Sequence, residues 1–153
     1  MNSEKYISVL GKYFGEPEIT SFLSEWGIRE KPKLKRGDDT TFLSAPPKGI
    51  ELTFETSETV TTSARDYPEG ALVLCNIRFY GVEADDFSPF KGELPFNVKF
   101  GDDKQKLISQ LGKPAWLNPS FTLIRWDVPN VSMFASLDKK ERVETFEIQL
   151  PVK

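Results

Sequence analysis

The side chains of this chain that could take part in catalysis are mainly carboxylates. Its 153 residues include no histidine and a single cysteine, Cys75. Without histidine, Ser–His–Asp and Cys–His nucleophile systems, histidine general bases and histidine-ligated metals are excluded. What remains is chemistry by Asp, Glu, Lys or Tyr, or by a serine–lysine pair. The sequence therefore indicates a protein that is not an enzyme and that acts by binding a partner.

Two groups of neighbouring acidic residues are the candidates for acid–base or metal chemistry. Glu83, Asp85 and Asp86 lack the regular oxygen spacing around a glycine that a calcium loop uses, so no metal site is predicted. Asp102 and Asp103 precede an apolar periodic segment, where a carboxylate caps the first turn of a helix. The glycines fall at helix ends and turns and form no phosphate-binding loop, so we expect neither catalytic residues nor a cofactor.

Cys75 lies in an apolar run over residues 71–80, which is typical of an interior strand. A lone cysteine cannot form an intrachain disulfide. In such a run we expect its thiol to be buried and inert.

The chain is mildly acidic, with a formal net charge of −3 and a pI near 5.2. A negative field does not favour nucleic acids or anionic membranes as partners. The basic residues between Arg29 and Arg36 are interpreted as a solvated loop. The sequence shows neither a signal-peptide pattern nor an apolar stretch long enough to span a bilayer, so we expect a cytoplasmic protein.

Hydrophobic periodicity, helix stops and turn residues predict short helices and antiparallel strands along the chain. The expected helices cover residues 3–14, 17–26 and 103–111. The expected strands cover residues 40–44, 49–55, 71–80, 94–100, 122–127, 131–137 and 142–150. This order is typical of an α+β fold in which short helices pack on an antiparallel β-sheet. The length fits a single domain, residues 1–153.

Two parts of the chain, residues 1–80 and 90–153, follow a similar order of elements. Each begins with a short amphipathic helix that ends in Gly-x-Pro, at Gly15–Pro17 and at Gly112–Pro114, and about three strands follow. One interpretation is a duplication that gives two α-β-β-β units. The other is that helix stops resemble one another, because glycine followed by proline is a common way to end a helix.

The segment between these two parts combines acidic and aromatic side chains in one expected loop. Acidic residues steer the approach of a basic partner, and aromatic residues dominate the binding free energy of many interfaces. Trp116 follows a helix, in a connection where a large aromatic side chain is often half covered, and Phe121 lies close by. For each aromatic residue, packing in the core is the alternative interpretation. The predicted partner-binding residues are Glu83, Asp85, Asp86, Phe87, Phe90 and Trp116.

Three segments together resemble a known sequence pattern: Phe90–Gly101, Leu111–Pro114 and Arg125–Asp127. The pattern is a G-x-L-P-x-x-L-x-F strand that enters a short helix ending in L-G-x-P. It resembles a group of small bacterial proteins with members among the immunity proteins of polymorphic-toxin and contact-dependent inhibition systems. In this chain Asn97-Val98 stands where that pattern has Gly-Leu. The helix is also similar to the repeats of β-lactamase inhibitory protein and of small outer-membrane assembly lipoproteins.

The resemblance implies helix-plus-antiparallel-sheet architecture and a protein-binding role, and it carries no catalytic residues with it. The function expected from it is that of a bacterial immunity protein, which binds and neutralises a cognate toxin. Two alternatives stay open. One is a structural or regulatory interaction module, for example a homodimer formed through an exposed strand edge. The other is a hydrolase that uses a pair of carboxylates alone.

Overall fold

The computed structural model describes residues 3–60, 65–84 and 86–152. Within them, three α-helices, two 3-10 turns and seven strands follow one another along the chain: α1 (Glu4–Val9), α2 (Pro17–Glu25), β1 (Thr40–Ala45), η1 (Pro46–Lys48), β2 (Ile50–Thr56), β3 (Leu72–Tyr80), η2 (Pro95–Asn97), α3 (Lys104–Leu111), β4 (Trp116–Leu117), β5 (Leu123–Val128), β6 (Val131–Leu137) and β7 (Val143–Gln149). This is an α+β fold, as predicted.

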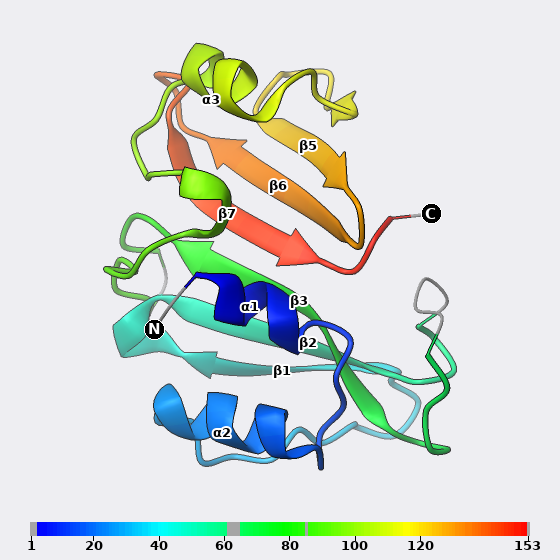
Figure 1. The fold of residues 1–153 in the computed structure, drawn as a ribbon. Helices are drawn as coiled ribbons and strands as arrows, with labels where there is room; N and C mark the ends of the chain where they lie inside the picture. The colour runs from blue at the N-terminus through cyan, green and yellow to red at the C-terminus, as the bar shows by residue number, and fades with distance from the viewer. Residues whose placement is uncertain (1–2, 61–64, 85, 153) are drawn as a thin grey trace.

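The strands form one antiparallel sheet in the order β1-β2-β3-β7-β6-β5-β4. Strands β1 to β3 make one meander, and strands β4 to β7 make a second (Figure 1). The two meanders join where β3 pairs with β7. The last strand of each meander therefore lies in the interior of the sheet, and the first strand of each lies at an edge.

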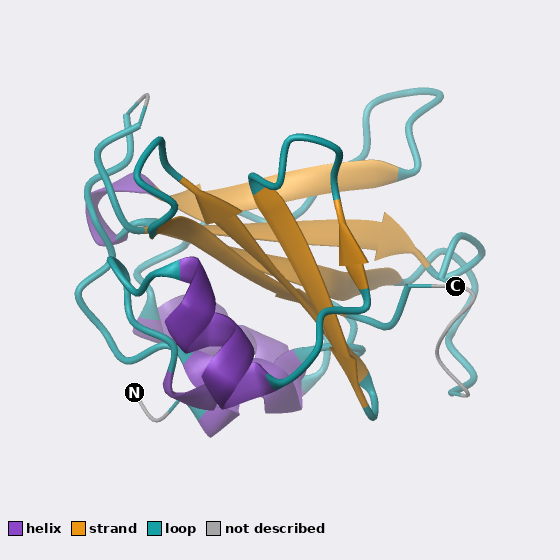
Figure 2. Ribbon diagram, turned by 90° about the horizontal axis from the view of Figure 1, so that it is seen from above, coloured by secondary structure: helices purple, strands orange, loops and turns teal. Residues whose placement is uncertain are grey.

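The core lies on one face of the sheet, where the helices pack (Figure 2). Alternation along each strand determines which side chains face it. In β2, for example, Ile50, Leu52 and Phe54 are fully buried, and the residues between them are half-buried. Leu107 of α3 and Ile19 and Phe22 of α2 close this core from the helix side.

An aromatic cluster ties the two N-terminal helices to the sheet. Tyr6 of α1 makes edge contacts with Phe22 of α2 and with Phe79 of β3, at centroid distances of 6.1 and 4.9 Å. Phe90 and Trp26 complete the cluster. Burial raises the pKa of the Tyr6 phenol to about 12, and nearby negative charge from Glu25 and Glu93 adds to the rise.

The first helix is shorter than predicted. The sequence predicts a helix over residues 3–14, but α1 ends at Val9, and Gly11 has a left-handed backbone (φ 85°). The chain then runs extended beside β3: Gly11 N–H donates to the Leu74 carbonyl, and Phe14 N–H donates to the Leu72 carbonyl, both at 2.8 Å. Sheet hydrogen bonds thus replace the helical ones over these residues.

The predicted strand over residues 94–100 is wrong. This segment forms η2 and a turn, in which Phe96 and Asn97 have φ values of 62° and 60°. Consecutive left-handed residues cannot lie in a β ladder. Asparagine adopts this conformation more easily than most other residues that carry a side chain, so Asn97 suits this turn. The next helix is as predicted: α3 is capped by Asp103, whose carboxylate accepts from Lys106 N–H at 2.8 Å.

No helix in the described part of the chain has the length and apolar character needed to cross a bilayer. The interpretation of residues 1–80 and 90–153 as repeated halves stays a prediction. The first meander has three strands and follows α1 and α2, whereas the second has four strands and follows α3.

Candidate functional site

The face of the sheet opposite the helices carries polar and aromatic side chains and has no helix over it among the described residues (Figure 2). Strand alternation places every second residue on this uncovered face. The pairing registers align one row of them across six strands: Glu51, Arg78, Glu147, Phe134, Arg125 and Trp116. Residues in such a row are direct cross-strand neighbours and interact through their side chains.

The row is anchored by an ion pair between Arg78 and Glu147. Both Nε and Nη2 of Arg78 contact Oε1 of Glu147, across the β3–β7 junction. Asn76 donates to the other oxygen of Glu147 at 3.4 Å and to Gln149 at 3.3 Å. The Arg78 guanidinium is therefore already matched by one carboxylate.

Glu51 lies on the other side of Arg78, on β2. Burial raises the pKa of Glu51 above its usual value and outweighs the opposing attraction of Arg78. The negative charge of Glu147 raises the pKa further, while a hydrogen bond from the Tyr80 phenol lowers it. Glu51 is thus a half-buried carboxylate, and the attraction of Arg78 and Tyr80 does not fully offset the cost of burying its negative charge.

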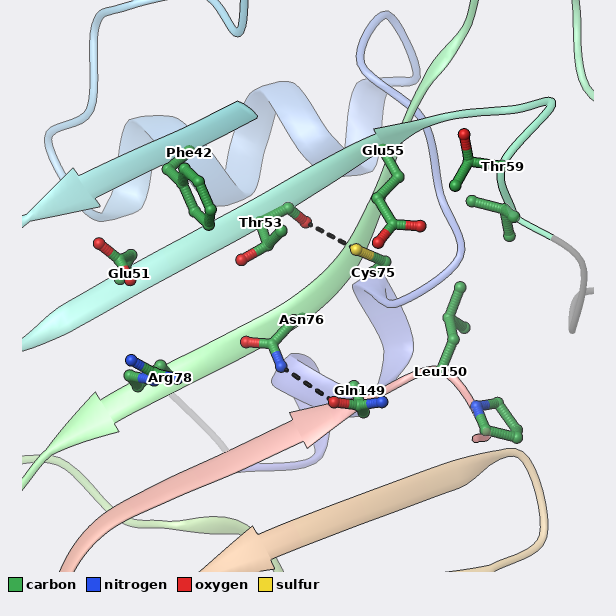
Figure 3. Close-up of a pocket in the computed structure, with 12 residues that line it drawn as sticks. Phe42, Glu51, Thr53, Glu55, Thr59, Cys75, Asn76, Arg78, Gln149 and Leu150 are labelled. Carbon is green, nitrogen blue, oxygen red and sulfur yellow. Dashed lines mark hydrogen bonds between the residues drawn. The ribbon is translucent and has the colours of Figure 1, made fainter. Parts of the chain in front are cut away.

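A groove of about 650 Å³ runs over this part of the uncovered face. Its lining includes Phe42 of β1, Glu51, Thr53 and Glu55 of β2, and Arg78 of β3 (Figure 3). The Phe42 ring is 59% exposed, which is the highest exposure among the large hydrophobic residues that the structure describes. The groove therefore combines an aromatic wall with charged and polar side chains.

Cys75 enters the groove lining at a bulge, where the register between β2 and β3 shifts next to Thr53. Its thiol donates to the Thr53 carbonyl at 3.4 Å (Figure 3). Burial raises the pKa of Cys75 to about 12, and the Glu55 carboxylate adds to the rise. The thiol is buried and stays protonated at neutral pH, so it is not an activated nucleophile.

The acidic and aromatic segment predicted to bind a partner is only partly exposed. Glu83 and Asp86 are exposed, and Asp85 lies outside the described residues. Phe87 is half-buried and stacks on Tyr80, with ring centroids 4.2 Å apart. Phe90 does not serve as an exposed anchor: it is 6% exposed and packs against Phe79 in the core.

Trp116 is 41% exposed on the short edge strand β4. Strands β7, β6 and β5 separate it from β3, at whose end Phe87 lies. The structure therefore does not bring the predicted residues together into one patch. It places Phe87 beside the interior strand β3 and Trp116 on the edge strand β4.

The patterns in the sequence did not predict the row of residues across this face. One signal was present, because polar residues alternate with apolar ones at Glu51, Thr53 and Glu55. The missing information was the pairing of β3 with β7, which brings Arg78 next to Glu147 from a position 69 residues away. Local periodicity carries no information about that pairing.

Glu51 and Glu147 are the two carboxylates of the row. They lie on strands β2 and β7, one on each side of β3, so their backbones are about 10 Å apart. The Arg78 side chain lies between them in the row. In the described residues, no three acidic or cysteine side chains are grouped closely enough to hold a metal ion.

No protein-family model matches the chain, and no curated protein does either. Among solved structures, the fold is similar to a cysteine-rich secretory protein from Staphylococcus aureus, with a TM-score of 0.55 and 10% identity. That likeness covers 94% of this chain and 45% of the other, so the chain spans less than half of that protein's length. A DUF4309 family protein from Bacillus subtilis is similar at a TM-score of 0.45 and 12% identity, over 86% and 77% of the two chains. The first likeness concerns the fold alone, and the second is too slight to carry an argument.

Proposed function

We propose that this chain is a protein-binding domain and that the uncovered face of its sheet is the contact surface. The observation that carries the proposal is the row from Glu51 to Trp116, in which arginine and aromatic side chains recur across the sheet. Tyrosine, tryptophan, phenylalanine and arginine are the residues enriched in protein interfaces. Such side chains on a face without a helix give a partner both apolar area and charge.

Among protein partners, we favour a cognate bacterial toxin. This part of the proposal rests on the resemblance of residues 90–127 to immunity proteins and on the acidic net charge of −3. An acidic binder associates rapidly with a basic partner, because complementary charges steer their encounter. Many toxins that act on nucleic acids need a basic surface for their substrate.

The test is binding to the protein encoded by the adjoining reading frame, measured by isothermal titration calorimetry. We expect Phe42→Ala and Trp116→Ala each to weaken the affinity at least about tenfold, as truncation of an interface aromatic does. Phe121→Ala is the matched control. Phe121 is 53% exposed, but it lies against Lys104 at the start of α3, away from the row.

Unchanged affinity in both Phe42→Ala and Trp116→Ala, or an equal loss in the Phe121 control, would refute the contact surface. A second measurement addresses the toxin. Co-expression of this chain should relieve growth arrest caused by the neighbouring protein, and Phe42→Ala and Trp116→Ala should relieve it less. Binding without any growth arrest to relieve would instead favour an interaction module unrelated to toxins.

A further inference from the structure

We propose that the groove on the uncovered face binds a lysine or arginine side chain of the protein partner, held between Glu51, Glu55 and the Phe42 ring. The inference rests on the proposed function and deepens it, because it states which chemistry of the partner this face recognises. Four features of the groove carry it.

The first feature is an excess of negative charge. Among the described residues, the groove lining contains two carboxylates, Glu51 and Glu55, and one cation, Arg78. Arg78 already contacts Glu147, which lies outside the lining. The ion pairs between described residues use other carboxylates, so neither Glu51 nor Glu55 has a cationic partner of its own.

The second feature is the partial burial of Glu51. A carboxylate that has lost part of its water is stabilised more by an arriving cation than a fully hydrated one, because the local dielectric constant is lower. The raised pKa of Glu51 has the same cause. A basic side chain would restore the interactions that burial removed.

The third feature is the aromatic wall. Phe42 is on the edge strand β1 and exposes 59% of its surface. Lysine and arginine place their alkyl stems along apolar surfaces while their charged ends reach polar groups, and a cation is also attracted to an aromatic face. In Figure 3, Phe42 lies on β1, and Glu51 and Glu55 lie along the neighbouring strand β2.

The fourth feature is that the chain does not fill the groove with a cation itself. None of the described residues that line it is a lysine, and its volume of about 650 Å³ leaves room for a side chain with its flanking backbone. Lys48, which follows β1, points elsewhere: its ammonium lies 5.8 Å from the centroid of the Trp26 ring. The site therefore stays available to a partner.

The experiment is an NMR titration of the ¹⁵N-labelled full chain with two blocked hexapeptides, one alternating lysine with threonine and one alternating glutamate with threonine. We expect the lysine peptide to shift the amides of Phe42, Glu51, Thr53 and Glu55, with binding that weakens as sodium chloride is raised. The glutamate peptide should shift none of these amides. Shifts that map elsewhere, or equal binding of both peptides, would overturn the inference.

A double variant, Glu51→Gln with Glu55→Gln, keeps the shape of both side chains and removes their charge. We expect it to bind the lysine peptide at least tenfold more weakly, while Glu18→Gln on α2 binds it as the wild type does. Circular dichroism establishes that each variant is folded. An affinity of the double variant equal to that of the wild type would also overturn the inference.

The two proposals fail in different ways. One outcome is that Phe42→Ala weakens the affinity for the neighbouring gene product while the double glutamine substitution leaves it unchanged. That result would mean that the uncovered face binds the partner without binding a basic side chain in the groove. The inference about the groove is then refuted, and the proposed function is retained. If neither of these changes nor Trp116→Ala affects that affinity, both proposals are refuted.

Discussion

Glu51 is a residue at which binding and stability are expected to conflict. Its pKa is raised in the folded state, first because of burial and then because of the negative charge of Glu147. Folding therefore disfavours its charged form. The destabilisation is absent below the unfolded-state pKa of about 4.3, grows as the pH rises through the folded-state value, and is fully present above it.

We predict that Glu51→Gln raises the free energy of unfolding at pH 7 and changes it little at pH 4, where the wild-type carboxyl is protonated. Urea denaturation at both pH values measures this. Glu18→Gln, on the exposed side of α2, should give no gain at pH 7. A loss of stability in Glu51→Gln at pH 7 would show that the attraction to Arg78 exceeds the cost of burial. The same substitution is expected to weaken binding of a basic partner, as happens where a site keeps an unfavourable charge for its function.

Gly49 lies at a position where the backbone of another segment leaves no room for a side chain. It follows η1 with a left-handed backbone (φ 70°), and the segment after β3 passes directly over it. A Cβ atom there would clash with the Ser88 carbonyl oxygen and would lie 2.5 Å from the Phe90 nitrogen. Both atoms belong to the backbone, so neither can move aside cheaply.

We predict that Gly49→Ala lowers the free energy of unfolding by at least about 2 kcal/mol, from left-handed strain together with the clash. Gly37→Ala separates the two causes. Gly37 also has a positive φ, 86°, but no atom lies within 4 Å of the position of its Cβ. It should lose only about 1 kcal/mol. Equal losses in the two variants, measured by urea denaturation, would contradict the close approach of residues 88–90.

At the scale of elements, strong local signals predicted most of the structure. The helix that begins at Pro17 and the helix capped by Asp103 are confirmed, as are the strands that became β1, β2, β3, β5, β6 and β7. Trp126 on β5 is buried: it is 2% exposed, and its indole N–H donates to the Gly112 carbonyl at 2.9 Å. These elements have a clear period, and their ends carry glycine, proline or an acidic cap.

The errors occur where contacts distant in sequence decide the backbone. Residues 11–14 follow a helical pattern, but Gly11 N–H donates to the Leu74 carbonyl, and the segment pairs with β3 instead. Residues 94–100 alternate like a strand, but Phe96 and Asn97 adopt left-handed conformations, and the Phe96 carbonyl accepts from the Gln110 side chain at 2.7 Å. For the candidate site, the sequence shows which polar and aromatic residues alternate along each strand. It does not show which of them become cross-strand neighbours, because that depends on the order of the strands in the sheet.

The two edges of the sheet differ in how they avoid pairing with other chains. The β4 edge is two residues long and lies between Pro114 and Pro119, which limits strand pairing. The β1 edge has six residues without charge or proline, and it exposes Phe42. Among the described residues, no hydrogen bond is found on its outer side. The β1 edge therefore lacks the usual protection against strand addition.

We predict that the wild type associates with itself as its concentration rises and that Ser44→Lys reduces this association. Ser44 lies directly opposite Glu51, so the new lysine has a carboxylate to pair with and the fold should be retained. Static light scattering over a concentration series measures the effect. Ser109→Lys, on the exposed side of α3, adds the same charge away from the edge. A decrease of equal size in both variants would point to net charge and not to the edge.

At the scale of the whole molecule, the two meanders share one core and one junction. Phe79 of the first meander and Phe146 of the second are opposite each other across β3 and β7, and both are fully buried. The junction is also covered by Phe90, which belongs to the connection between the meanders and packs against Phe79. Neither half can lose its packing without exposing the other.

We therefore predict a single cooperative unfolding transition. Urea midpoints followed by tryptophan fluorescence and by far-UV circular dichroism should coincide, because Trp26 belongs to the first half and Trp116 and Trp126 to the second. Arg78→Ala should shift both midpoints together to lower urea, since it leaves Glu147 half-buried without its cation. Two separate transitions would instead mean that residues 1–80 and 90–153 are independently stable units.

The junction between β3 and β7 also has a consequence for the synthesis of the chain. Arg78 and Glu147 are 69 residues apart, so the inner edge of β3 leaves the ribosome long before its partner strand exists. At about 5–20 residues per second, this interval lasts roughly 3 to 14 seconds. During that time residues 11–14 can pair with Leu72–Leu74, but the β7-facing edge of β3 from Asn76 to Tyr80 has no partner strand. Chaperones that bind emerging chains should therefore engage this protein most strongly between the synthesis of residue 80 and that of residue 143.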